Sequence, residues 1–284
     1  MSRRPFLPPL LASPPGTNLG SRVLGDLCHR SVPQPLLAAM IRLYARHTGA
    51  NLEESAVAPE ACGTFAEFFT RRLRPGVRPV DRSNGTVVSP VDGRIQAFDR
   101  LDEGGRFDQV KGHAYSVEEF LGGPEEAGSF RRGWYAVLYL SPGDYHRIHC
   151  PVDGTLRSWK HIPGTLVSVQ PFFCNLVAGL LVSNERVLSR IETRRGPVVT
   201  GMVGACGVGR IRLAHDDLET NRGNRRGAER ILDPMVSVRR GDELGLFDLG
   251  STVVLLLADE ALKPVPELVS GQPVRMGMAL FRRS

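Results

Sequence analysis

The spacing of apolar side chains divides the chain into a helical beginning and a β-rich remainder. Near residue 40, apolar and aromatic residues fall on one helical face and basic residues fall elsewhere: Leu36, Leu37, Met40, Ile41 and Tyr44 against Arg42, Arg46 and His47. We therefore expect residues 1 to about 60 to form a helical segment. Its apolar face either packs against the rest of the protein or lies in a membrane interface, with basic side chains toward the headgroups.

Two short helices are marked by capping signals at their N-termini. Thr64 and Glu67 have the spacing of a capping box, and so do Ser116 and Glu119. Apolar residues follow each signal: Phe65, Phe68 and Phe69 after the first, Phe120 and Leu121 after the second. The arginines at 71–72 are expected to close the last turn of the first of these helices.

Between and after these helices the pattern changes to short apolar runs typical of β-strands. Four runs are bounded by Gly or Pro at most of their ends: Thr86 to Ser89, Trp134 to Leu140, Pro197 to Val203 and Thr252 to Leu257. Ala214 to Arg230 is polar and aperiodic, which predicts a mobile surface loop. We expect a β-rich α+β protein in which Ser251 begins a strand of the same sheet system that carries Asp92 and the loop of His146 and His149.

Composition narrows the class of protein without naming a substrate. A chain of 284 residues, 42% of them hydrophobic, is long enough for one catalytic body with a small appendage. The formal charge of +6 favours a negatively charged partner such as nucleic acid, anionic lipid or an acidic metabolite. The five cysteines are scattered without a CxxC pair, so neither a zinc site nor a disulfide framework is expected. No apolar run approaches the roughly 20 residues that span a bilayer.

The first candidate motif is Ser89-Pro90-Val91-Asp92-Gly93, a strand end that turns through Asp-Gly. Taken alone, Asp92 is a turn residue whose carboxylate caps backbone N–H groups. The functional alternative is a buried carboxylate that orients a histidine.

The second candidate motif, Asp144 to His149, carries two histidines three residues apart. The spacing places no third metal ligand, and the nearby Pro142, Gly143 and Pro151 argue against a helix that would align the pair, so no metal site is expected. His146 and His149 are then either structural or catalytic. The chemical argument for catalysis is that imidazole is the side chain best suited to exchange protons near neutral pH.

The third candidate motif is Leu249-Gly250-Ser251-Thr252, which leads directly into an apolar strand. A Gly-Ser pair before a strand is ordinarily a tight turn. The chemical alternative is that the Ser251 hydroxyl attacks the Gly250 carbonyl, because a glycine has no side chain to crowd the tetrahedral intermediate.

Taken together, these motifs resemble the bacterial phosphatidylserine decarboxylase family. Ser89 to Gly93, Tyr145 to His149 and Leu249 to Thr252 occur in the family's order and at suitable separations. Three further stretches are similar to family sequence: Phe68 to Asp81, Lys111 to Ser116 and Asn184 to Val187. The resemblance runs from about residue 60 to the C-terminus. One departure is Gln170, where the family pattern leads us to expect Asn, so no role is assigned to that loop.

The resemblance implies a triad that first acts on the protein itself. His149, oriented by Asp92, would take the hydroxyl proton of Ser251, and Ser251 would attack the carbonyl of Gly250. The amide becomes an ester, and β-elimination leaves dehydroalanine, which hydrolyses to a pyruvoyl group and ammonia. The products would be residues 1–250 and a pyruvoyl-started chain of residues 251–284. His146 would position the substrate and return a proton after CO2 leaves, with His149 as the alternative for that last step.

The same resemblance implies the substrate and the cofactor. Phosphatidylserine would form a Schiff base with the pyruvoyl group, which accepts the electrons left by loss of CO2, and phosphatidylethanolamine would be released. Neither a metal nor pyridoxal phosphate is then required. The implied partners are phosphatidylserine, anionic membrane lipid and the two chains of one precursor, and the sequence is compatible with a homo-oligomer. No nucleic-acid partner is expected, since charge is its only support.

The resemblance also implies an organisation and a location. Residues 1–60 would be a helical membrane-associating segment and residues 61–284 a catalytic β-rich domain of barrel-sandwich-like form. The protein would lie on the cytoplasmic side of the cell membrane as a peripheral protein, where arginines contribute about 1 kcal/mol each near an anionic surface.

Two other functions remain as alternatives. In the first, the β-rich body is a non-enzymatic binding or carrier module in which Gly250-Ser251 and Asp92-Gly93 are plain turns, so the chain would stay intact. In the second, a pyruvoyl enzyme decarboxylates a soluble amino acid, and the amphipathic N-terminal segment argues against it.

Overall fold

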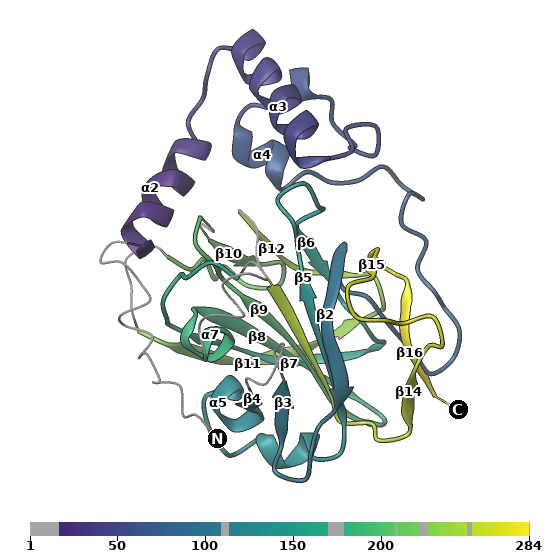
Figure 1. Ribbon diagram of the computed structural model, residues 1–284. Coiled ribbons are helices and arrows are strands. Elements are labelled where there is room, and N and C mark those ends of the chain that lie inside the picture. Colours follow the sequence, from purple (N-terminus) through teal and green to yellow (C-terminus); the bar gives the residue numbers. More distant parts are fainter. Residues whose placement is uncertain are drawn as a thin grey trace, which may run out of the picture.

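The N-terminal part of the chain is helical in the computed structural model, which describes residues 17–108, 114–169, 179–207, 210–221, 226–248 and 252–283. Its elements are α2 (Thr17–Cys28), α3 (Gln34–Thr48), a 3₁₀ turn (Pro59–Ala61) and α4 (Phe65–Phe69). These helices lie together at one end of the molecule, beyond the ends of the strands (Figure 1). The expected helical segment is confirmed for its described part, while residues 1–16 lie outside the described residues.

Helix α3 buries a narrower face than the sequence pattern predicts. Leu37 and Ile41 are fully buried, but Leu36 and Met40, expected on the same packed face, are 52% and 43% exposed. The helix ends at Gly49, whose left-handed backbone (φ 77°) lets its N–H donate to the Ala45 carbonyl. One apolar stripe of α3 therefore packs on the protein, and a second stripe faces outward.

The two capping signals differ in outcome. Ser116 forms a complete capping box with Glu119 at the start of α5 (Val117–Leu121), as predicted. Thr64 accepts a hydrogen bond from the Glu67 N–H, but the Glu67 carboxylate accepts from the Gly63 N–H instead, so that box is only half formed. Helix α4 also ends at Phe69, and the arginines at 71–72 lie beyond its last turn, which corrects the expected boundary.

Within the described residues, the main sheet has eight antiparallel strands in the order β11-β7-β8-β9-β13-β5-β2-β15. Its strands are β2 (Gly93–Arg100), β5 (Trp134–Tyr139), β7 (Gly154–Ile162), β8 (Arg186–Thr193), β9 (Gly196–Val203), β11 (Ala228–Val238), β13 (Thr252–Leu257) and β15 (Pro273–Val274). The predicted strands at 134–140, 197–203 and 252–257 are confirmed as β5, β9 and β13.

Smaller sheets and short helices complete the described part of the fold. One small sheet has the order β1-β16-β14, a second has the order β10-β12-β6, and β3 pairs with β4. Their strands are β1 (Thr86–Val88), β3 (Arg106–Asp108), β4 (Ala114–Ser116), β6 (Arg147–His149), β10 (Ile211–Leu213), β12 (Glu243–Phe247), β14 (Leu262–Pro264) and β16 (Ala279–Arg283). The remaining helical pieces are a 3₁₀ turn (Ala127–Phe130) and α7 (Leu180–Ser183).

Strand β13 runs through the core, and this position explains why its sequence is continuously apolar. Val253, Leu255 and Leu257 join one apolar cluster, and Val254 and Leu256 join another on the opposite face. A strand buried on both faces has no reason to alternate polar and apolar residues. The antiparallel sheets and the short helices together confirm the prediction of a β-rich α+β protein.

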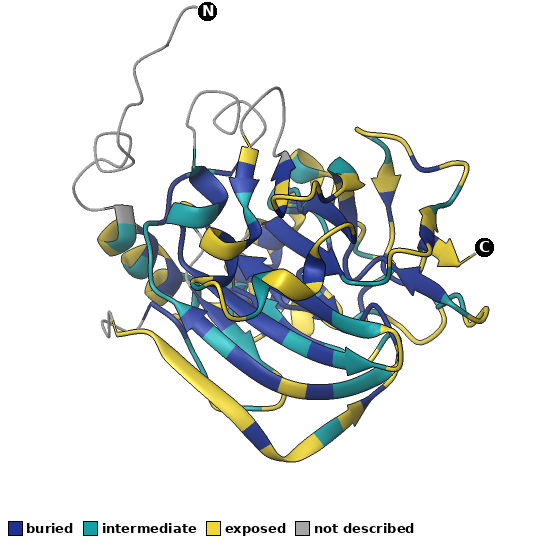
Figure 2. Cartoon of the chain, turned by 90° about the horizontal axis from the view of Figure 1, so that it is seen from below, coloured by how far each residue is buried: buried dark blue, intermediate teal, exposed yellow. Residues whose placement is uncertain are grey.

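Two expectations about strands and loops are corrected. The polar stretch 214–230 is not a loop throughout, because β11 begins at Ala228 and the Asp216 carboxylate accepts hydrogen bonds from Trp159 and Arg230. Strand β11 forms an exposed edge of the main sheet (Figure 2), and its exposed residues are mixed, because Ile231 and Met235 are 67% and 57% exposed among polar neighbours. The histidine strand β6 belongs to a different sheet from β2 and β13.

No helix in the described ranges is long and apolar enough to cross a membrane.

Candidate active site

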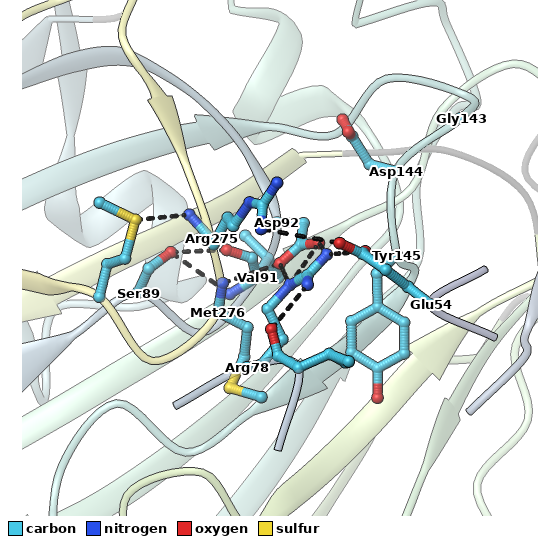
Figure 3. Close-up of polar contacts among 12 residues, drawn as sticks. Glu54, Arg78, Ser89, Val91, Asp92, Gly143, Asp144, Tyr145, Arg275 and Met276 are labelled. Atoms are coloured by element: carbon cyan, nitrogen blue, oxygen red, sulfur yellow. Dashed lines mark hydrogen bonds and ion pairs between the residues drawn. The ribbon is translucent and has the colours of Figure 1, made fainter. Parts of the chain in front are cut away.

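Asp92 lies in the turn between β1 and β2, and its carboxylate is buried and fully paired. Arg78 donates from Nε and Nη2 to the two oxygens, the closest contact being 2.6 Å, and the Met276 N–H donates at 2.8 Å (Figure 3). The following residue is glycine because a Cβ at Gly93 would lie 2.3 Å from the Tyr139 carbonyl oxygen. The Asp-Gly turn thus brings the start of β2 into close contact with the end of β5.

Arg78 links Asp92 to a second carboxylate. Its Nη2 also donates to Glu54 at 2.5 Å, and Arg275 lies 3.6 Å from the other Glu54 oxygen (Figure 3). Burial alone would lower the pKa of Arg78, but its hydrogen bonds to Asp92 and Glu54 raise it above the usual value. Arg78 therefore remains charged and holds Asp92 in place with a bidentate contact.

His149 ends strand β6 with both ring nitrogens engaged. Nδ1 lies 2.7 Å from the Gly241 carbonyl oxygen, and Nε2 lies 3.0 Å from the Tyr145 hydroxyl. Since a carbonyl only accepts, Nδ1 carries the proton and Nε2 presents its lone pair to the Tyr145 O–H. Burial lowers the pKa of His149 and raises that of Tyr145 to about 12, so the imidazole stays neutral and the phenol stays protonated. The arrangement gives a neutral base with a defined tautomer.

His146 lies three residues earlier and has a different environment. Its side chain is completely buried, its ring packs on Phe69 with centroids 4.2 Å apart, and Nδ1 lies 2.8 Å from the Asp144 carbonyl oxygen. Burial lowers the pKa of His146 to about 3. Among the described residues, Nε2 has no hydrogen-bond partner. A buried, unpaired acceptor is costly, so it fits a position where an incoming group supplies a donor.

The structure brings the Asp92 turn and the histidine strand together through their backbones. The His149 N–H donates to the Pro90 carbonyl at 2.8 Å. Their side chains are not joined, because within the described residues the Asp92 carboxylate is bound by Arg78 and Met276, whereas His149 is bound by Gly241 and Tyr145. The predicted contact in which Asp92 orients His149 is not present in this structure.

The predicted cleavage position, Gly250 and Ser251, lies outside the described residues, but both flanks are described. On the N-terminal flank, the Phe247 N–H donates to the His146 carbonyl at 3.0 Å. On the C-terminal flank, Thr252 is paired with Tyr139 of β5, and Tyr139 is paired on its other side with Arg94 of β2. Because neighbouring strands lie about 4.8 Å apart, this register places the beginning of β13 two strand spacings, roughly 10 Å, from the beginning of β2, with β5 between them.

The helical segment contacts the histidine loop directly. The Tyr44 hydroxyl donates to the Pro142 carbonyl at 2.7 Å, and Arg71 donates to the Gly143 carbonyl at 3.1 Å. Gly143 has to be glycine here, since a Cβ would lie 2.4 Å from the Thr48 carbonyl oxygen. Helix α3 and the loop before His146 are therefore in close contact.

Sequence reasoning missed the residues that hold the predicted ones. Tyr145 stands inside the histidine motif, and its i, i+4 spacing from His149 could have placed both on one side of an extended strand. Arg78 lies in a stretch recognised only as family-like. No local signal marks Gly241, which reaches His149 from far along the chain. No group of three or more His, Cys, Asp or Glu in the described part of the chain is arranged to hold a metal ion.

Comparison with known proteins places these motifs in one family. The family model described as phosphatidylserine decarboxylase matches residues 65–282. The phosphatidylserine decarboxylase proenzyme of Myxococcus xanthus is 39% identical over 90% of this chain and 91% of its own length. The proenzyme of Acidovorax ebreus is 41% identical over 87% and 88%, and that of an Anaeromyxobacter strain is 38% identical over 99% of both chains. The chain therefore belongs to the phosphatidylserine decarboxylase family.

Proposed function

We propose that the chain cuts its own backbone between Gly250 and Ser251 and then decarboxylates phosphatidylserine to phosphatidylethanolamine with the pyruvoyl group that forms at Ser251. Its family makes it a carboxy-lyase that is made as a proenzyme and serves phospholipid biosynthesis. One observation carries the proposal, the placement of the two flanks: Phe247 is hydrogen-bonded to the His146 backbone, and Thr252 lies two strands from Arg94, with Tyr139 between them. The N-terminal flank thus contacts the histidine motif, and the C-terminal flank lies two strands from the strand that follows the Asp92 turn.

His149 is the base of the proposed self-cleavage. Its Nε2 is the atom that accepts the Ser251 proton, because Nδ1 already carries a proton that it donates to Gly241. The contact with Gly241 fixes the ring in this tautomer, a role that the family resemblance implies for Asp92. In the structure Tyr145 donates to this lone pair, so the Tyr145 O–H must turn away from Nε2 before the Ser251 hydroxyl can donate its proton there.

Asp92 acts through its charge in this proposal. Burial lowers the pKa of His149, and the negative charge of Asp92 opposes that effect. An imidazolium formed when Ser251 is deprotonated would therefore be stabilised by Asp92 even without a direct hydrogen bond. Arg78 keeps the carboxylate in position but also neutralises part of its field.

His146 is the proposed substrate-positioning residue. A pyruvoyl ketone supplies the electron sink that no ordinary side chain offers for a carbanion next to an amine. The buried lone pair of His146 Nε2 fits the approach of a group that carries a proton, and the same atom can return a proton to carbon. Because His146 is neutral, it must first take the proton that it later gives back.

A lipid surface is the proposed location of the substrate. Helix α2 exposes Leu19, Val23 and Leu27 at helical spacing, and α3 exposes Leu36, Met40 and Leu43. Rows of exposed apolar side chains on helices are typical of proteins that bind the membrane interface. We assign these rows to contact with anionic lipid on the cytoplasmic side of the cell membrane.

The finer description of the architecture also remains a proposal. Separate apolar clusters on the two faces of the main sheet support a barrel-sandwich-like body. Helices α2 and α3 at one end support a division into residues 1–60 and 61–284, although α4 of the second part packs against α3; cleavage would give a large and a small chain that stay together.

The function is tested by phosphatidylethanolamine formation in vesicles that contain phosphatidylserine. We expect the purified wild-type chain to form it and the Ser251→Ala variant to form none. The matched control is Ser270→Ala, an exposed serine of the same C-terminal fragment, which should behave as wild type. Activity on free serine but not on vesicles would favour the soluble amino-acid alternative, and undiminished activity of Ser251→Ala would exclude the pyruvoyl proposal.

A further inference from the structure

Asp248 is a buried carboxylate immediately before the predicted cleavage segment. Its Oδ2 lies 2.9 Å from His29 Nε2, its Oδ1 accepts from Arg212 Nη2 at 2.6 Å, and only 2% of the side chain is exposed. Its backbone N–H donates to the Arg210 carbonyl at 2.9 Å. Burying a carboxylate is costly unless both oxygens are satisfied, so these partners determine where Asp248 lies.

One of these partners comes from the N-terminal segment. His29 directly follows α2, and further polar contacts tie that helix to the same end of the body. They are Asp26 with Arg210, Ser21 Oγ with the Gly207 N–H at 3.0 Å, and Asn18 with the Gly164 carbonyl at 3.0 Å and the Leu166 N–H at 3.1 Å. Each contact is made by a side chain of α2 or of the residue after it.

Helix α2 is docked in an unusual way for an amphipathic helix. It turns polar side chains toward the protein while Leu19, Val23 and Leu27 are 60%, 50% and 51% exposed. An amphipathic helix normally packs through its apolar side. The docking of α2 therefore depends on its polar contacts, and the one with Asp248 reaches the chain segment that is to be cut.

Asp248 is two residues from Gly250 in the sequence, and Thr252 on the other side is fixed between β5 and β9. Self-cleavage needs the Ser251 hydroxyl and the Gly250 carbonyl aligned at about 3 to 3.5 Å. Only three residues separate these two described ends. The C-terminal end is held by the sheet, and the N-terminal end is held by Arg212 and by His29.

We propose that His29 is a positioning residue for self-cleavage: by binding Asp248 it makes correct placement of the scissile segment depend on the docked α2 helix. This inference rests on the proposed cleavage between Gly250 and Ser251. His29 takes no part in proton transfer, and after cleavage Asp248 belongs to the large chain. Its contact with His29 is therefore needed for processing and not for turnover of the lipid.

The test compares the rate at which freshly made full-length precursor splits. We expect His29→Ala to slow splitting roughly 10- to 100-fold, the scale of a misplacement of about 1 Å. His29→Gln keeps an N–H that can reach Asp248 and should recover most of the rate. The control is His215→Ala, an exposed histidine of the body, which should split as wild type. Activity per split molecule should be the same in all four proteins.

A double-variant comparison separates positioning from general loss of stability. His29→Ala combined with Asp248→Asn should split no more slowly than Asp248→Asn alone, because the second change already weakens the His29 contact together with the Arg212 pair. If His29→Ala splits at the wild-type rate, or if Gln is as slow as Ala, the inference is wrong while the proposed function stands. If wild type does not split between Gly250 and Ser251, the proposed function fails first.

Discussion

Two histidines three residues apart in one motif are held in different hydrogen-bonding states. His149 has both nitrogens engaged, whereas His146 has a buried Nε2 without a partner among the described residues. Both rings are kept neutral by burial, which lowers their pKa values. The same physical effect thus yields a base in a fixed tautomer at one position and an open acceptor at the other.

The lowered pKa of His149 predicts how processing depends on pH. A base works while it is unprotonated, so its activity is lost only as the pH falls through its own pKa. Because burial holds this pKa below the ordinary value of about 6.5, the splitting rate should stay constant as the pH is lowered from about 7.5 through 6.5. The measurement is the rate of precursor splitting across this range, with circular dichroism as a control for folding. A midpoint at or above about 6.5 would contradict the assignment.

The sequence predicted the reacting residues better than the residues that hold them in place by hydrogen bonds. Asp92, His146 and His149 could be named because they stand in recognisable motifs with chemistry-bearing side chains. Their partners could not be, because contacts such as His149 with Gly241 and Asp92 with Met276 join residues far apart in the chain. The expectation that Asp92 binds a histidine overlooked Arg78, which competes for the carboxylate with a charged, bidentate fork.

At the scale of elements, burial decides which strands the sequence reveals. Strand β13 is apolar on both faces and bounded by Gly-Ser, so its limits agree with the prediction to the residue. Strand β11 is an exposed edge (Figure 2), and its first three residues, which include Glu229 and Arg230, continue the polar pattern that predicted a loop. Strands β6 and β10 have three residues each, too few for a periodicity.

Helix α3 has one buried and one outward apolar stripe, and the sequence pattern alone does not tell them apart. The outward stripe yields a prediction about membrane binding. Leu43 is 69% exposed, so replacing it by Asp should leave the fold intact. If the outward stripe enters the lipid interface, the loss of roughly 1.5 to 3 kcal/mol of burial should weaken binding to anionic vesicles about tenfold or more. Vesicle flotation measures this.

The matched control is Val269→Asp, a similar change at a residue that is 57% exposed and distant in sequence from the helices. It should float as wild type does. Equal flotation of the two variants would show that the α3 stripe does not contact lipid.

At the scale of the whole molecule, the fold brings together segments from all parts of the chain. The first helices contact the histidine loop through Tyr44 and the residue before the cleavage segment through His29. The main sheet then sets Thr252 beside Tyr139, and Tyr139 beside Arg94. A long-range arrangement of this kind is consistent with a proenzyme that becomes able to react with itself only after it has folded.

The most direct test of this account is the intact mass of the purified chain. Wild type should give two species, residues 1–250 and residues 251–284 with a keto group in place of the serine amine. His149→Ala should remain a single chain, since loss of a triad base slows such chemistry by roughly 10³- to 10⁴-fold. A wild-type protein that forms phosphatidylethanolamine while its mass shows one unbroken chain with an ordinary serine at position 251 would contradict the account.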